Sequence, residues 1–133
     1  MPQKKIVNEY AKIALFSDDL VFIEIMKRIF EKLKIELQYT VYKLFADASH
    51  VFKNQKFDLI LVDNLIVGRS SYELIYYLRI NQKISCPIFY FGVTDYQGDK
   101  RSLLIGANVF INKPFNPEDV TKTIQETLKN KIK

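Results

Sequence analysis

The sequence predicts an α/β fold: a doubly wound, five-stranded parallel sheet with helices on both faces. Two observations predict this class. Short apolar runs alternate five times with segments whose apolar residues recur at helical spacing, which is typical of strand–helix–strand units with right-handed crossovers. The central run, within residues 57–63, is apolar without alternation, as expected for a strand that is buried on both faces.

Length and composition are those of an ordinary globular domain. The chain has 133 residues, of which 48% are apolar and 26% are charged. We expect a flexible segment over residues 1–10 and one domain over residues 11–130. The single cysteine, Cys86, cannot form an internal disulfide, which favours a cytoplasmic location. No apolar run has the length of a membrane span, so we expect no membrane association.

The net charge of +5 raises the question of nucleic-acid binding. The lysines are spread along the chain, from Lys4 to Lys133, and no zinc-ligand spacing or recognisable nucleic-acid-binding motif accompanies them. We interpret the charge as solvated helix faces with a basic tail. Nucleic-acid binding through this domain is therefore not expected.

The first strand and helix are predicted from the first third of the chain. Residues 12–16 form a short apolar run that ends at Ser17. From residue 20 to residue 33 the apolar residues have the spacing of an amphipathic helix. The acidic pair Asp18 and Asp19 stands at the start of this helix, where carboxylates cap the free N–H groups and complement the helix dipole.

The middle of the chain predicts two further strands and two helices. Residues 35–45 are rich in β-branched and aromatic residues and alternate with polar ones, which predicts a strand near the edge of the sheet. A short helix near residues 48–52 precedes the central strand at 57–63. A helix over residues 70–81 follows it.

The last third completes the alternation. Residues 87–91 predict the fourth strand, with a proline at its first position, where a missing N–H costs least. Residues 95–105 predict a helix that Gly106 ends. The fifth strand is expected at 108–112, and Asn116 is expected to cap the final helix.

Polar side chains follow three of the predicted strands: Asp18 after the first, Asp63 after the third and Lys113 after the fifth. In a sheet of flavodoxin-like order, 2-1-3-4-5, we expect these strands to be neighbours whose carboxyl ends converge, where doubly wound sheets bind ligands. Two carboxylates can hold Mg²⁺, which keeps several waters and shares phosphate oxygens. A lysine can pair with a phosphoryl oxygen.

The sequences FDLILVDNLI and INKPF, with SDD after the first strand, resemble the receiver domain of bacterial two-component response regulators. The resemblance covers nearly the whole chain. It implies that Asp63 accepts a phosphoryl group and that Lys113, before a cis-prone Pro114, is the catalytic lysine. It also implies Mg²⁺ as the cofactor, held by Asp18, Asp63 and the backbone carbonyl of Leu65.

The chain departs from the family pattern at several positions, including Val67 in place of the usual proline, and two departures concern the site. Ser17 stands where family members have the first of two acids, and Asp19 lies one position too late, on the helix. Counting from the proline of the fourth strand, the Ser or Thr that hydrogen-bonds the phosphoryl oxygen falls at Gly92, which has no hydroxyl. Thr94 lies two residues further on. Phe110 matches the fifth-strand aromatic residue that turns inward on activation.

The resemblance implies a signalling domain and not an enzyme. A histidine kinase or phosphotransfer protein would phosphorylate Asp63, and the fourth helix, fifth strand and fifth helix would form a face for a downstream protein partner. Formation of a homodimer is left open. The alternative, suggested by Ser17 and Gly92, is a pseudo-receiver that binds a protein partner without phosphorylation.

Overall fold

The computed structural model describes residues 10–93 and 98–132. Its sheet has five strands in the order β2-β1-β3-β4-β5, and every pair of neighbouring strands is parallel. The predicted fold class and strand order are therefore confirmed. The strands are β1 (Ala11–Phe16), β2 (Leu37–Tyr42), β3 (Leu59–Asp63), β4 (Ile88–Gly92) and β5 (Val109–Asn112).

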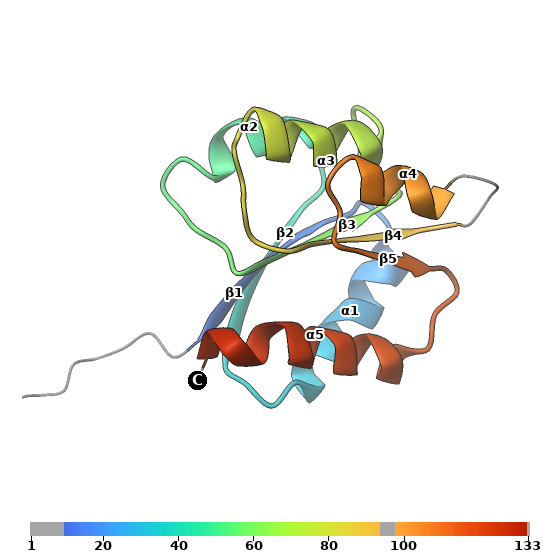
Figure 1. Cartoon of the computed structure of the whole chain (residues 1–133). Helices are drawn as coiled ribbons and strands as arrows, with labels where there is room; N and C mark the ends of the chain where they lie inside the picture. The colour runs from blue at the N-terminus through green and yellow to red at the C-terminus, as the bar shows by residue number, and fades with distance from the viewer. Residues whose placement is uncertain (1–9, 94–97, 133) are drawn as a thin grey trace, which may run out of the picture.

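Helices cover both faces of the sheet (Figure 1). The helices α1 and α5 lie on one face, and α2, α3 and α4 lie on the other. A short 3-10 turn, η1, leads into α2. The bounds are α1 (Leu20–Lys32), η1 (Phe45–Asp47), α2 (Ala48–Val51), α3 (Ser71–Ile80), α4 (Gly98–Leu104) and α5 (Pro117–Ile132). In the described part of the chain, no helix is long and apolar enough to cross a membrane.

Two apolar layers hold the helices against the sheet. Every residue of β3 and of β4 is buried. Leu59 and Leu61 of β3 face α1 and α5, whereas Ile60 and Val62 face α2 and α3, since alternate side chains of a strand point to opposite faces. Each fully buried aliphatic side chain stabilises the fold by about 1.5–3 kcal/mol. The two central strands are therefore a rigid support for the residues at their ends.

The helix caps agree with the sequence. The Asn116 Oδ1 accepts a hydrogen bond of 2.8 Å from the backbone N–H of Glu118 at the start of α5. Gly106 has a φ of +131° after the end of α4, a conformation that favours glycine. At α1 the cap is Asp19 alone, which accepts bonds from the backbone N–H groups of Val21 (3.0 Å) and Phe22 (3.3 Å).

The second strand is shorter than predicted. It covers 37–42 and not 35–45, and its central residues are exposed. As the edge strand it pairs only with β1, so the chain leaves the sheet once that pairing ends. The predicted start of the fourth helix at Asp95 lies outside the described residues, and so does the predicted flexible segment 1–10 except Tyr10.

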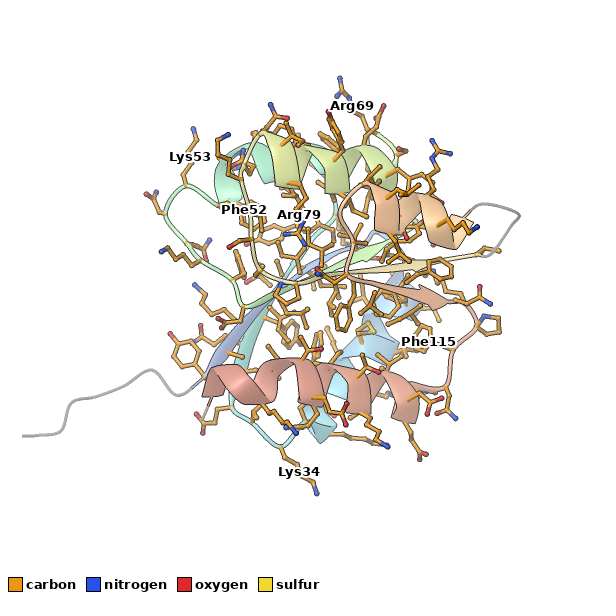
Figure 2. The ribbon with its side chains drawn as sticks, in the orientation of Figure 1. Lys34, Phe52, Lys53, Arg69, Arg79 and Phe115 are labelled. Atoms are coloured by element: carbon orange, nitrogen blue, oxygen red, sulfur yellow. The ribbon has the colours of Figure 1, made fainter. Side chains whose placement is uncertain are left out.

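Arg79 ties the end of α3 to the amino edge of the sheet, and Figure 2 shows it between that helix and the strands. Its guanidinium donates to the carbonyl oxygens of Gly106 (3.0 Å), Ile84 (2.8 Å) and Cys86 (2.8 Å), and to Asn108 Oδ1 (2.8 Å). Desolvation by this partial burial lowers the pKa of Arg79 from its ordinary value. One side chain thus fixes four positions in the segments that lead into β4 and β5.

Candidate functional site

The carboxyl edge of the sheet brings Asp63 and Lys113 together. β3 ends at Asp63, whose side chain is fully buried, and Lys113 follows β5. The Lys113 Nζ donates to Asp63 Oδ1 at 2.7 Å. One part of the sequence prediction was wrong: the strands carrying these residues are not neighbours, because β4 lies between β3 and β5. The contact forms because the flexible four-carbon stem of lysine reaches across β4.

Three donors satisfy the Asp63 carboxylate. Ser17 Oγ donates to Oδ2 at 2.7 Å, while the backbone N–H of Asn64 (2.9 Å) and the Lys113 ammonium donate to Oδ1. The Ser71 hydroxyl donates to the Asp63 backbone carbonyl and so fixes the main chain at the start of α3. A buried carboxylate needs such donors, since an unpaired one would be strongly destabilising.

Lys113 is held by more than its ion pair. Its Nζ also donates to Asn64 Oδ1 at 3.0 Å and lies 4.8 Å from the centroid of the Phe22 ring. Its backbone N–H donates to the Gly92 carbonyl at 2.9 Å. The Lys113–Pro114 peptide bond is cis. The ammonium is thereby positioned at the site with 20% of its side chain exposed, open to an incoming anion.

Asp18 lies at the same edge and takes part through its backbone. Its N–H donates to the Leu65 carbonyl at 2.9 Å, so the two residues lie side by side, β1 and β3 being neighbours. Within the described residues, the Asp18 carboxylate has no hydrogen bond or ion pair. The Asp19 carboxylate caps α1, while its backbone N–H donates to Ser17 Oγ at 3.0 Å, so both acidic residues lie at the site through their backbones.

The donor atoms at this edge have the chemistry that Mg²⁺ prefers. The carboxylates of Asp18 and Asp63 and the Leu65 carbonyl are hard oxygen ligands. Among the described residues, no group of three acidic, histidine or cysteine side chains could hold a metal ion. Ser17, where the family pattern has an acid, is neutral and donates a hydrogen bond to Asp63. A metal that binds Asp63 Oδ2 must compete with the Ser17 hydroxyl.

Sequence reasoning did not anticipate the roles of Ser17 and Asn64. The family pattern shows Ser17 only as the loss of an acid, whereas in the structure it is fully buried and hydrogen-bonded to Asp63. A hydroxyl residue directly after the strand that neighbours β3 could have indicated this contact. Phe110 is half-buried, and its ring lies 5.9 Å from that of Tyr90. Thr94 lies outside the described residues.

Comparison with known proteins identifies the class of protein to which this fold and this site belong. A family model described as "Response regulator receiver domain" matches residues 13–125. The transcriptional regulatory protein YvrH of Bacillus subtilis (strain 168) is 30% identical over 128 residues, which cover 91% of this chain and 50% of that protein. This chain belongs to the response regulator receiver domain family.

Solved structures agree on the fold. A two-component response regulator from Clostridium difficile has a TM-score of 0.79 at 19% identity, covering 92% of this chain and 99% of that chain. The Mn(2+)-bound form of response regulator Rcp1 has a TM-score of 0.73 at 15% identity, covering 92% of this chain and 95% of that one. The chain spans about half or less of the length of the curated relatives it matches.

Proposed function

We propose that this receiver domain accepts a phosphoryl group on Asp63 from a histidine kinase or phosphotransfer protein and is not itself an enzyme with its own substrate. The observation that carries the proposal is the buried Asp63 carboxylate, paired with the Lys113 ammonium at 2.7 Å at the carboxyl edge of the sheet. The proposal is supported by the position of this carboxylate and this positive charge at the edge where doubly wound sheets bind ligands.

The chemistry follows from these residues. An Asp63 oxygen forms a bond to phosphorus while the P–N bond of the phosphohistidine donor breaks, and the electron pair of that bond leaves with the imidazole. Lys113 neutralises charge on the transferred phosphoryl group. The residues that would hold Mg²⁺ are Asp18, Asp63 and the Leu65 carbonyl; when bound, the ion supplies positive charge to the phosphoryl oxygens.

The surface beside the site suits a protein donor. A groove of about 370 Å³ lies between the start of α1 and the start of α5, and Lys113 and Phe115 are among its lining residues. Leu20 and Val21, at the start of α1, are 67% and 69% exposed. On the opposite side of the sheet, Leu104 of α4 is 85% exposed, which supports the proposal that the α4–β5–α5 face binds a downstream protein. The proposed setting is the cytoplasm.

Intact-mass spectrometry after incubation with acetyl phosphate tests the proposal. We expect a Mg²⁺-dependent phosphoryl adduct on the wild type and none on Asp63→Asn. Asp58→Asn is the matched control, because Asp58 lies just before the other end of β3 and accepts a hydrogen bond from the Lys12 backbone N–H at 2.8 Å. An adduct that persists in Asp63→Asn would contradict the assignment of the acceptor.

A second candidate is a pseudo-receiver, which binds a protein partner without phosphorylation. It is favoured by one observation: both Asp63 oxygens already have donors, and Ser17 supplies one of them in place of a metal-binding acid. This candidate predicts no adduct under any condition and a partner affinity that Mg²⁺ and acetyl phosphate leave unchanged. A large change in that affinity on adding both reagents would exclude it.

A further inference from the structure

The side chain of Tyr90 fills the space above Gly92. A Cβ atom built on Gly92 would lie 2.5 Å from the Tyr90 Cε2 and 2.7 Å from both its Cζ and its Oη. Side-chain carbons do not approach other atoms this closely, so residue 92 can be no larger than glycine while the Tyr90 ring keeps this position. The hydroxyl end of the ring occupies the place of the side chain that residue 92 lacks.

This place lies at the phosphorylation edge of the sheet. Asp63 pairs with Phe91, so Gly92 is one residue further toward the carboxyl edge on the adjacent strand. With strands about 4.8 Å apart and a rise of about 3.3 Å per residue, the Gly92 Cα lies about 6 Å from that of Asp63. The Gly92 carbonyl accepts the Lys113 N–H at 2.9 Å. The Tyr90 hydroxyl is thus beside a residue whose carbonyl hydrogen-bonds the Lys113 backbone.

Aromatic neighbours hold the ring in this position. Tyr90 is only 5% exposed. Its ring centroid lies 5.2 Å from that of Tyr72 on α3 and 5.9 Å from that of Phe110 on β5. A ring packed on these contacts presents its hydroxyl with little rotational freedom, which lowers the entropic cost of a hydrogen bond made there.

We propose that Tyr90 supplies the hydroxyl that hydrogen-bonds a phosphoryl oxygen on Asp63, and that Gly92 is glycine to make room for it. The proposal rests on the function proposed above. It assigns to Tyr90 a phosphoryl-binding role that residue 92 cannot fill, and it gives the phosphorylated state a direct contact with Phe110 through the ring. A change in the position of the Tyr90 hydroxyl on phosphorylation then alters the packing of the β5 aromatic residue.

The first test compares Tyr90→Phe, which removes only the hydroxyl, with the matched control Tyr72→Phe on the adjacent ring. The measurement is the acetyl phosphate concentration that half-labels the protein, determined by intact mass. Because a hydrogen bond to a charged group is lost, we expect this concentration to rise roughly tenfold in Tyr90→Phe and to stay near the wild-type value in Tyr72→Phe. Equal values for Tyr90→Phe and the wild type would overturn the inference.

The second test moves the hydroxyl back to residue 92. Gly92→Thr alone should lower the melting temperature, since the added Cβ meets the Tyr90 ring, whereas in the Tyr90→Val background the threonine fits. We expect Tyr90→Val to label poorly and Tyr90→Val with Gly92→Thr to label like the wild type. If the double variant melts no lower than Tyr90→Val alone and still labels as poorly as Tyr90→Val, the inference is overturned.

The two proposals fail in different ways. A wild-type protein that takes no phosphoryl group contradicts the proposed function and this inference with it. A wild-type protein that is labelled on Asp63, with Tyr90→Phe labelled equally well, contradicts the role of Tyr90 alone.

Discussion

At the scale of single residues, the site is defined by which donors reach Asp63. The carboxylate is fully buried, and Ser17 and Lys113 bind different oxygens of it, each at 2.7 Å. Ser17 is neutral where the family pattern has an acid, so the site has one negative charge fewer with which to hold a divalent cation. We therefore expect residue 17 to affect the proposed binding of Mg²⁺ most directly.

Ser17→Asp should strengthen Mg²⁺ binding, roughly tenfold or by about 1.4 kcal/mol, because it adds a carboxylate and removes the hydroxyl that competes for Asp63 Oδ2. A Mg²⁺ titration followed by nuclear magnetic resonance measures the change. Without Mg²⁺ the variant should melt at a lower temperature than the wild type, since two carboxylates then repel each other.

Ser17→Asn is the matched control, because asparagine has the shape of aspartate without its charge. It should not gain Mg²⁺ affinity. If Ser17→Asp binds Mg²⁺ no more tightly than Ser17→Asn does, the charge of residue 17 does not limit metal binding and the competition argument is wrong.

Residue identity alone could predict Asp63, Lys113 and Asp18, because each follows an apolar run that reads as a strand. The hydrogen bond from Ser17 and the role that we propose for Tyr90 could not be predicted in the same way. Their roles depend on distances between strands: Ser17 lies on the strand next to Asp63, and Tyr90 reaches the edge only because Gly92 has no side chain. A strand pattern shows on which face a side chain lies, but not how far along the strand its end extends.

At the scale of elements, the two central strands and the caps followed from local sequence, whereas the edge strand did not. The apolar runs of β3 and β4 are buried throughout, so burial pattern and element coincide. The β2 segment is half exposed, and its ends depend on where pairing with β1 stops. Pairing is a tertiary property, which β propensity does not fix.

Arg79 is the strongest single link between elements outside the two apolar layers. Arg79→Ala should lower the free energy of unfolding by about 2–3 kcal/mol, because carbonyl groups of Gly106, Ile84 and Cys86 lose a charged donor. Urea denaturation followed by circular dichroism measures the loss.

Arg69→Ala provides the control for Arg79. Arg69 is exposed, and Figure 2 shows it at the outer surface; its guanidinium lies 5.4 Å from the Phe45 ring centroid. We expect a change within about 0.5 kcal/mol for this exposed side chain. Equal effects of the two substitutions would show that the Arg79 hydrogen bonds contribute nothing beyond those of a surface arginine.

At the scale of the whole molecule, the parallel order of the sheet explains why distant residues form one site. Ser17, Asp63 and Lys113 are separated by 46 and 50 positions in the chain but meet because parallel strands end at the same edge. The predicted convergence of Asp63 and Lys113 is confirmed, although β4 lies between the strands that carry them. That strand carries Gly92 and Tyr90, for which we propose a phosphoryl contact, between Asp63 and Lys113.

The most direct test of the account locates the phosphoryl group itself. Protein labelled with acetyl phosphate and Mg²⁺ is reduced with borohydride, which converts a phosphorylated aspartate to homoserine, and its peptides are then analysed by tandem mass spectrometry. The account predicts homoserine at position 63 and at no other aspartate. Homoserine at Asp18 or Asp19, or an adduct that yields none at position 63, would contradict it.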